Sequence, residues 1–153
     1  MGLSSADIDA VIAGRTIPSL FAQQVAARPD AVALRGRPPG SESATASLTW
    51  AEYADQACRV ASGLAALGVQ RGQRVLLMMR NRPEFHPSDI GVLLAGATPI
   101  SIYNSSSPEQ IEYLATHSEA VAAIVGDVGM LERFLKVRSE TPALQKLVLI
   151  DDP

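Results

Sequence analysis

The chain has 153 residues, of which 47% are apolar and 19% charged. This composition is that of a folded domain with a sizeable core and excludes a disordered chain. The net charge of −3 offers no basic surface for DNA or RNA, so we expect no nucleic-acid partner. No apolar run approaches the ~18 residues of a membrane span, and the N-terminus lacks the pattern of a signal peptide. We therefore expect a cytoplasmic protein without a transmembrane segment.

The first predicted elements are a helix and a hairpin. Residues 1–15 are expected to be an N-terminal tail, and the unit that follows spans residues 16–153. Pro29 marks the end of a first helix, and alternating apolar residues after it indicate a strand. A stretch rich in Pro, Gly and Ser then indicates a loop. They predict a helix over 16–29, a strand over 32–35, a loop over 36–47 and a returning strand over 48–50.

A longer helix is predicted to start after Thr49. Thr49 and Glu52 have the spacing of a capping box, in which each side chain accepts a hydrogen bond from the backbone amide of the other residue. An apolar stripe follows at helical spacing, and Gly68 is placed to end the helix in a left-handed turn. The stripe consists of Tyr53, Ala57, Val60, Ala61, Leu64 and Leu67. Cys58, the single cysteine, falls within this helix and is expected to be a small buried residue.

The remainder of the sequence alternates strands and helices. The continuous apolar run Val75–Met79 is typical of a strand covered on both faces. A helix reaching Leu94, a strand over 98–103, a helix from Pro108, a strand over 121–125, a helix over 130–137 and a strand over 146–150 follow. This order predicts an α/β fold, a doubly wound and mostly parallel sheet of about five strands flanked by helices, with the hairpin at one side.

Three serines, Ser105 to Ser107, lie where a strand gives way to a helix, and a phosphate-binding loop is one reading of them. A helix start is the other, and we favour it. Ser107 and Gln110 form a second capping box, and Pro108 occupies the first helical position, where its missing N–H costs nothing. Glu109 places a carboxylate in the first turn, which would repel an anion.

Other candidate sites are incomplete. Gly63 and Gly68 have the separation of a P-loop, but Val69 and Gln70 replace its lysine and hydroxyl residues. The segment 126–129 follows a strand as dinucleotide-binding glycines do, but lacks the first glycine of that pattern. His86 and His117 have no metal-ligand spacing, and Asp151 and Asp152 are interpreted as a solvated tail. The sequence therefore assigns no catalytic, cofactor-binding or metal-binding residue.

Three motifs in order resemble a known family. They are LTWAEY at 48–53, RNRPEF at 80–85 and LLAGATPISIYNSSSPEQIEYL at 93–114. Together they resemble the N-terminal part of the AMP-forming acyl-CoA synthetases, and the last is most similar to the long-chain fatty acid–CoA ligases. The resemblance covers about residues 16–152. In one departure from the family, His86-Pro87-Ser88 interrupts an apolar helix, so that this helix either starts later, with Pro87 in its first turn, or is distorted there.

The resemblance implies a two-step reaction that uses ATP, magnesium and coenzyme A and forms first an acyl-adenylate and then an acyl-CoA. The family's phosphate-binding loop and its lysines have no counterpart in this sequence, so we expect the chain alone to be inactive. The implied partner is a separately encoded remainder of the ligase, and the isolated chain is expected to self-associate through an uncovered apolar face. Two alternatives are a stand-alone flavodoxin-like binding module and a vestigial product of a split gene.

Overall fold

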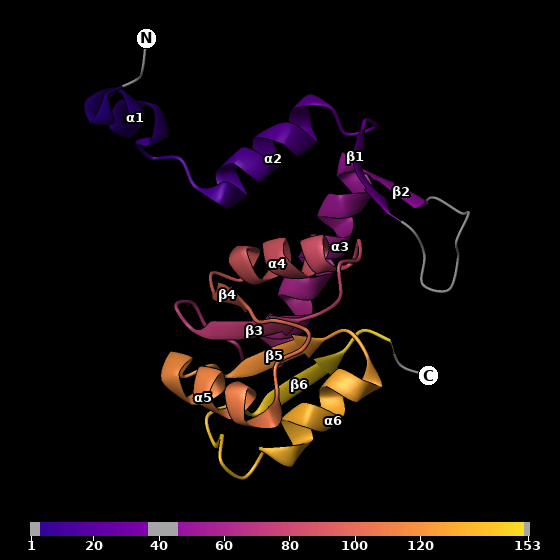
Figure 1. Cartoon of the computed structure of the whole chain (residues 1–153). Helices are drawn as coiled ribbons and strands as arrows, with labels where there is room; N and C mark the ends of the chain where they lie inside the picture. Colours follow the sequence, from indigo (N-terminus) through magenta and orange to yellow (C-terminus); the bar gives the residue numbers. More distant parts are fainter. Residues whose placement is uncertain (1–3, 37–45, 152–153) are drawn as a thin grey trace.

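The computed structural model describes residues 4–36 and 46–151 (Figure 1). In chain order its elements are α1 (Ser5–Ile12), α2 (Ile17–Ala27), β1 (Val32–Gly36), β2 (Ala46–Thr49), α3 (Trp50–Ala66), β3 (Arg74–Met78), α4 (Phe85–Leu94), β4 (Thr98–Ser101), α5 (Pro108–Ser118), β5 (Ala122–Val125), α6 (Val128–Lys136) and β6 (Lys146–Leu149). Most of the predicted loop over 36–47 lies outside the described residues. No described helix has both the length and the apolar character that crossing a membrane requires.

The central sheet is parallel, with strand order β4-β3-β5-β6. This confirms the α/β fold class. The described sheet has four strands instead of about five, because β1 and β2 pair only with each other, as a separate antiparallel hairpin. Trp50, which was predicted to end the second arm of this hairpin, is instead the first residue of α3.

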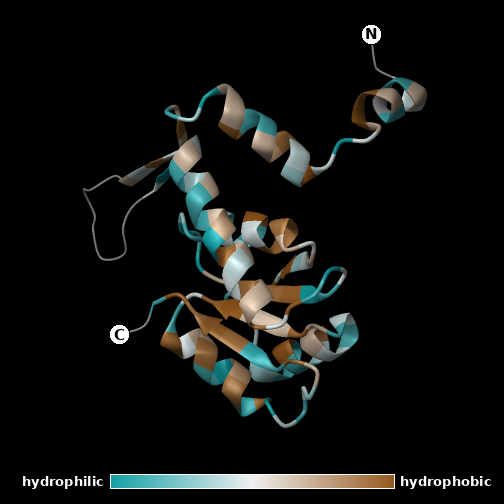
Figure 2. Cartoon of the chain, turned by 180° about the vertical axis from the view of Figure 1, so that it is seen from behind, coloured by the Kyte–Doolittle hydropathy of each residue, from teal (hydrophilic) through white to brown (hydrophobic). Residues whose placement is uncertain are grey.

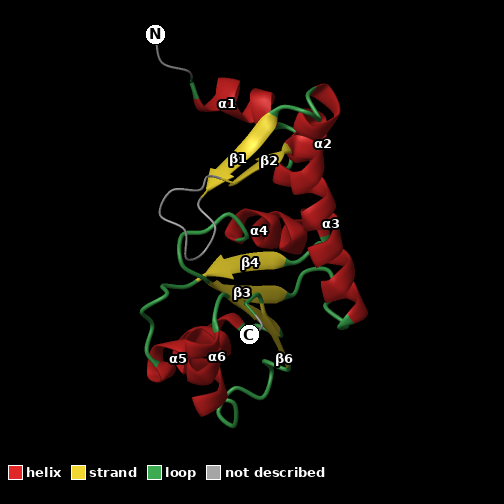
Figure 3. Cartoon of the chain, turned by 90° about the vertical axis from the view of Figure 1, so that its right-hand side faces the viewer, coloured by secondary structure: helices red, strands yellow, loops and turns green. Residues whose placement is uncertain are grey.

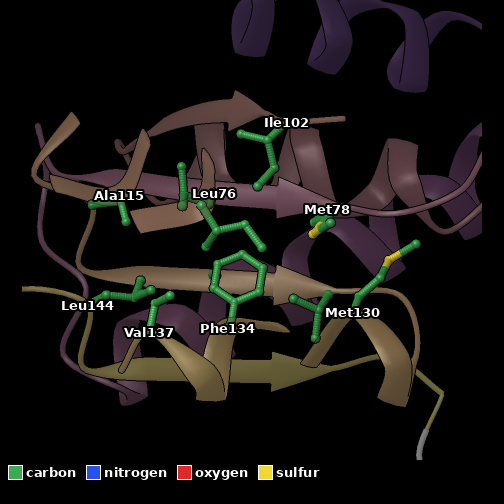
Figure 4. Packing of buried hydrophobic residues seen from close by; sticks show 12 residues of the cluster. Leu76, Met78, Ile102, Ala115, Met130, Phe134, Val137 and Leu144 are labelled. Carbon is green, nitrogen blue, oxygen red and sulfur yellow. The ribbon is translucent and has the colours of Figure 1, made fainter. Parts of the chain in front are cut away.

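Helices cover the two faces of the sheet from different parts of the chain (Figure 3). Leu76 and Met78 of β3 belong to the cluster under α5 and α6. Val75 and Leu77 belong to the cluster under α3 and α4. The first cluster surrounds Phe134, which is almost completely buried among residues of all four strands and both helices (Figure 4). Burial on both faces explains why β5 and the part of β3 that follows Arg74 are continuous apolar runs.

Helices α3 and α4 pack closely because α4 carries a glycine at the contact. A Cβ on Gly91 would lie 2.6 Å from the Cβ of Val60 and 2.9 Å from the carbonyl oxygen of Ala57. The Tyr53 hydroxyl also donates to the His86 carbonyl at 3.3 Å. Helix α4 begins at Phe85, so Pro87 lies in the first turn, where its missing N–H breaks no helical hydrogen bond. The proline is thus accommodated, which is the first of the two expected alternatives.

The N-terminal elements extend away from the sheet (Figure 1). The expected tail contains α1, whose N-cap Ser4 forms a capping box with Asp7. Helix α2 has no fully buried residue. It contacts the rest of the chain through Phe21, whose ring lies 5.9 Å from that of Trp50 and 4.9 Å from that of Tyr53. These aromatic contacts join α2 to the start of α3.

Candidate functional site

Open parallel sheets bind ligands beyond the carboxyl ends of their strands, where neighbouring strands send their connections to opposite faces. In this sheet that place lies between β3 and β5, because β3 leads to α4 on one face and β5 leads to α6 on the other. The loops after the two strands meet there, and the Gly126 amide donates to the Met78 carbonyl at 2.9 Å. This edge is the first place to look for a site.

Arg82 occupies this edge and binds groups from three segments. Its Nε donates to Glu84 at 2.8 Å, and its Nη2 donates to Asp151 Oδ1 at 2.9 Å. Its Nη1 donates to Asp151 Oδ2 at 2.5 Å and to the Gly126 carbonyl at 3.4 Å. The Arg82 side chain is only 12% exposed. A single guanidinium therefore links the ends of β3, β5 and β6.

The charge of Arg82 is already balanced within the chain. Hydrogen bonds from Arg82 hold the pKa of Asp151 and the pKa of Glu84 below their usual values. The same hydrogen bonds, with Asp151 first, raise the pKa of Arg82. Asp151 is exposed, as expected of a solvated residue, but it is an ion-pair partner of Arg82 and not part of a free tail. Asp152 lies outside the described residues.

The residues of the loop after β5 have capping and packing roles. Asp127 is the N-cap of α6: it accepts from the Met130 amide at 2.8 Å and lies 3.6 Å from Arg80 Nε. A Cβ on Gly126 would lie 3.3 Å from the Cα of Met79. The glycine therefore permits close packing of two loops, which accounts for it without a bound dinucleotide.

The serine segment is a helix start, as predicted. Ser107 accepts from the Gln110 amide, Gln110 accepts from the Ser107 amide at 2.9 Å, and Pro108 is the first residue of α5. The Ser107 hydroxyl also donates to Glu109 at 2.6 Å, which lowers the pKa of that carboxyl. Ser106 is buried, and its carbonyl accepts from Arg133 at 2.9 Å. A negative Glu109 in the first turn opposes phosphate binding.

A shallow hollow of about 460 Å³ adjoins this helix start. Its lining includes Tyr103, Tyr113 and Glu109. The two tyrosines are exposed, and His117 stacks on Tyr113 with 5.5 Å between ring centroids. The hollow offers aromatic surface and a carboxylate, and it lacks a cation to hold a phosphate.

The capping interpretation predicts a stability effect at Ser107. Ser107→Ala should lower the free energy of unfolding by about 1 kcal/mol, because the N-cap hydrogen bond to the Gln110 amide is lost. Urea unfolding followed by circular dichroism measures this. Ser105→Ala is the matched control, since Ser105 is exposed and caps no helix, and its effect should stay within about 0.5 kcal/mol. Unchanged stability in Ser107→Ala would contradict the capping role.

The surroundings of His86 and Cys58 do not indicate a binding site. His86 lies edge-on to Phe85, and no group of three or more His, Cys, Asp or Glu among residues 4–36 and 46–151 could hold a metal ion. Cys58 is exposed on α3, so the expectation of a buried cysteine is wrong. Burial raises the pKa of Tyr53 to about 12, which keeps its hydroxyl protonated as the donor to His86.

The residues at this edge do not fit a nucleotide with its magnesium ion. A triphosphate needs uncommitted cations or amides, whereas Arg82 and Arg80 both pair with carboxylates. Helix α6 has its first turn capped by Asp127, and α5 carries Glu109. The described carboxylates also do not gather into a metal-binding group. No chemical step can be derived from these side chains.

Comparison with known proteins identifies relatives over most of the chain. The model of the AMP-binding enzyme family matches residues 21–153. An uncharacterized protein of Mycobacterium tuberculosis is 38% identical over 136 residues, which are 89% of this chain and 73% of that protein. The long-chain-fatty-acid–CoA ligase FadD15 of Mycobacterium bovis is 34% identical over 103 residues, which are 67% of this chain and 17% of the ligase.

A solved structure shows the same fold. The inhibitor-bound N-terminal domain of FACL13 from Mycobacterium tuberculosis matches 88% of this chain with a TM-score of 0.74, at 22% sequence identity. The match covers 33% of that domain. This chain therefore spans about a third of the solved domain and a smaller share of the ligase FadD15.

Proposed function

Because this chain belongs to the AMP-binding enzyme family, we propose that it is the first structural block of a long-chain fatty acid–CoA ligase. The observation that carries the proposal is the match to FadD15, at 34% identity over a segment that makes up 17% of that ligase. The motifs at 48–53, 80–85 and 93–114 all lie within the family match. The last of these motifs is the one that most resembles the long-chain ligases.

In this proposal the chain contributes the framework and not the reacting groups. A fatty acid attacks the α-phosphate of ATP and releases pyrophosphate, and coenzyme A then displaces AMP from the acyl-adenylate. The commitment of Arg82, Asp127 and Glu109 to ion pairs and helix caps supports placing this chemistry outside the chain. The phosphate-binding loop, the magnesium site and the lysines would come from a remainder polypeptide.

A stand-alone binding module is the second candidate. The Mycobacterium tuberculosis relative favours it, because the 136 matched residues make up 73% of that protein. A protein of this family can therefore consist of little more than this block. The hollow beside Tyr103 and Tyr113 would be the surface available to such a module.

Pyrophosphate exchange into ATP with palmitate as the acid distinguishes the candidates. We expect no exchange above background by the chain alone, because Arg80 and Arg82, the arginines at the carboxyl edge of the sheet, already pair with carboxylates. Exchange should appear when the chain is co-expressed with FadD15 that lacks its matched 103 residues. Intact FadD15 is the positive control.

Two results would contradict the first candidate. Exchange by the chain alone would show that it holds its own catalytic groups. Absence of exchange in the co-expressed pair, with intact FadD15 active, would favour the stand-alone module.

A further inference from the structure

Strand β6 is half-buried, with residues that pack against a cluster on each face of the sheet. Leu147 and Leu149 pack against the cluster under α5 and α6. On the opposite face, Val148 and Ile150 line an open hollow of about 290 Å³. The other wall is α3, with Val60, Gly63, Leu64 and Leu67. We call this hollow the α3–β6 groove. Figure 2, which views the molecule from the α3 side, shows apolar strands next to this long helix.

Most of the residues that line the α3–β6 groove are apolar, like those of a protein interior. Parallel strands are ordinarily buried on both faces, and the sequence from Leu147 to Ile150 is continuously apolar. Leu67, at the end of α3, is 42% exposed. Gly63 has open space where its Cβ would be, so an approaching side chain could reach the backbone of α3.

The unpaired edge of β6 also favours a binding surface at this strand. Among the described residues, β6 pairs with β5 alone. The opposite edge strand, β4, contains Pro99, which cannot donate to an added strand. Strand β6 has no proline, and its only charged residue is Lys146 at the start. Of the two edge strands of the described sheet, β6 is therefore the one whose backbone edge is not interrupted by a proline.

We propose that the α3–β6 groove is the docking site for an apolar helix of the ligase remainder, an inference that rests on the proposed function. Most of the ligase lies outside this block, which spans 17% of FadD15 and 33% of the solved FACL13 domain. Arg82 holds Asp151 at the carboxyl end of β6, and Ile150 at that end lines the groove. The chain of a full-length ligase continues from this end, beside the groove. A helix fits because helices cover the faces of parallel sheets.

Two substitutions test the groove without disturbing the core. Gly63→Leu fills it from the last turn of α3, where the new Cβ would have no atom within 4 Å apart from its chain neighbours and the backbone of its own helix, and it replaces a poor helix former by a good one. Leu67→Lys places a charge at its rim. Leu135→Lys is the matched control, because Leu135 is 49% exposed at the end of α6, on the other face of the sheet.

The measurement is the affinity of the full chain for the FadD15 remainder defined above, by co-purification and sedimentation. Gly63→Leu and Leu67→Lys should each weaken binding at least tenfold, whereas Leu135→Lys should stay within twofold of the wild type. The melting temperature of Gly63→Leu should be unchanged or higher, which separates lost docking from lost folding.

Three outcomes would overturn the groove assignment. If both groove variants bind the remainder and restore exchange like the wild type, the groove assignment fails and the proposed function stands. If the wild type neither binds the remainder nor restores exchange, both fail. If the chain alone sediments as a dimer and Gly63→Leu makes it monomeric without affecting the remainder, a second copy is the occupant instead.

Discussion

Replacing Phe134 by alanine is expected to lower the free energy of unfolding by about 3–5 kcal/mol. Phe134 is the largest of the fully buried side chains and lies at the centre of the cluster between the sheet and α5 and α6 (Figure 4). Its removal loses the transfer free energy of the ring and leaves a cavity that the parallel strands can fill only in part. Urea unfolding followed by circular dichroism gives the change.

The neighbouring residue provides the control for Phe134. Leu135→Ala alters the same helix at an exposed position, so its effect should stay near 0.5 kcal/mol. Similar losses in the two variants would contradict the assignment of Phe134 to the core. The fluorescence of Trp50, which packs with Phe21 and Tyr53 at the start of α3, reports on a different cluster. Coincident transitions of the two signals would show that both clusters unfold together.

Features with local causes could be predicted from the sequence. Thr49 and Ser107 begin helices because each side chain accepts a hydrogen bond from a backbone amide only three residues away. The pattern can therefore be recognised in a segment of four residues. The buried strands were visible as continuous apolar runs. The helix α1 had a comparable signal, Ser4 with Asp7, but it was interpreted as part of a tail.

Features that depend on distant segments could not be predicted. Arg82 and Asp151 are 69 residues apart, and only the order of strands in the sheet brings them together. The close approach of Gly91 to Val60 likewise depends on how α3 and α4 cross the same face. Cys58 follows the buried Ala57 in α3 but faces solvent, because consecutive helical residues point about 100° apart.

Arg82→Met is expected to destabilise the fold by about 1–3 kcal/mol at neutral pH. Methionine keeps most of the length of the side chain but removes every hydrogen bond to Glu84, Asp151 and the Gly126 carbonyl. Breaking a buried ion pair costs about 3–5 kcal/mol. Glu84 and Asp151 are 38% and 46% exposed, so water can replace part of what they lose, and we expect a smaller value.

The pH dependence identifies the cause of the Arg82 effect. Arg82 lowers the pKa of Asp151 and of Glu84 from their usual 3.8 and 4.5, so the folded state binds fewer protons than the unfolded state. The stabilisation is therefore complete above the unfolded-state values and is lost as the pH falls through the lower folded-state values. The difference between wild type and Arg82→Met should be largest at pH 7 and clearly smaller at pH 3. Urea midpoints at pH 7, 5 and 3 measure this trend.

An exposed ion pair of the same chain serves as the control for Arg82. Arg59 Nε lies 2.9 Å from Asp55 Oδ2 one helical turn away on α3, and both side chains are largely exposed. Such pairs contribute about 0.3–0.5 kcal/mol, so Arg59→Met should change stability little at any of the three pH values. If both arginine variants lose the same stability at pH 7, or if the Arg82→Met difference does not shrink in acid, the link between β3, β5 and β6 is not electrostatic. With the expected result, the Arg82 guanidinium is committed to linking the carboxyl ends of β3, β5 and β6, so that it is not available to bind a triphosphate.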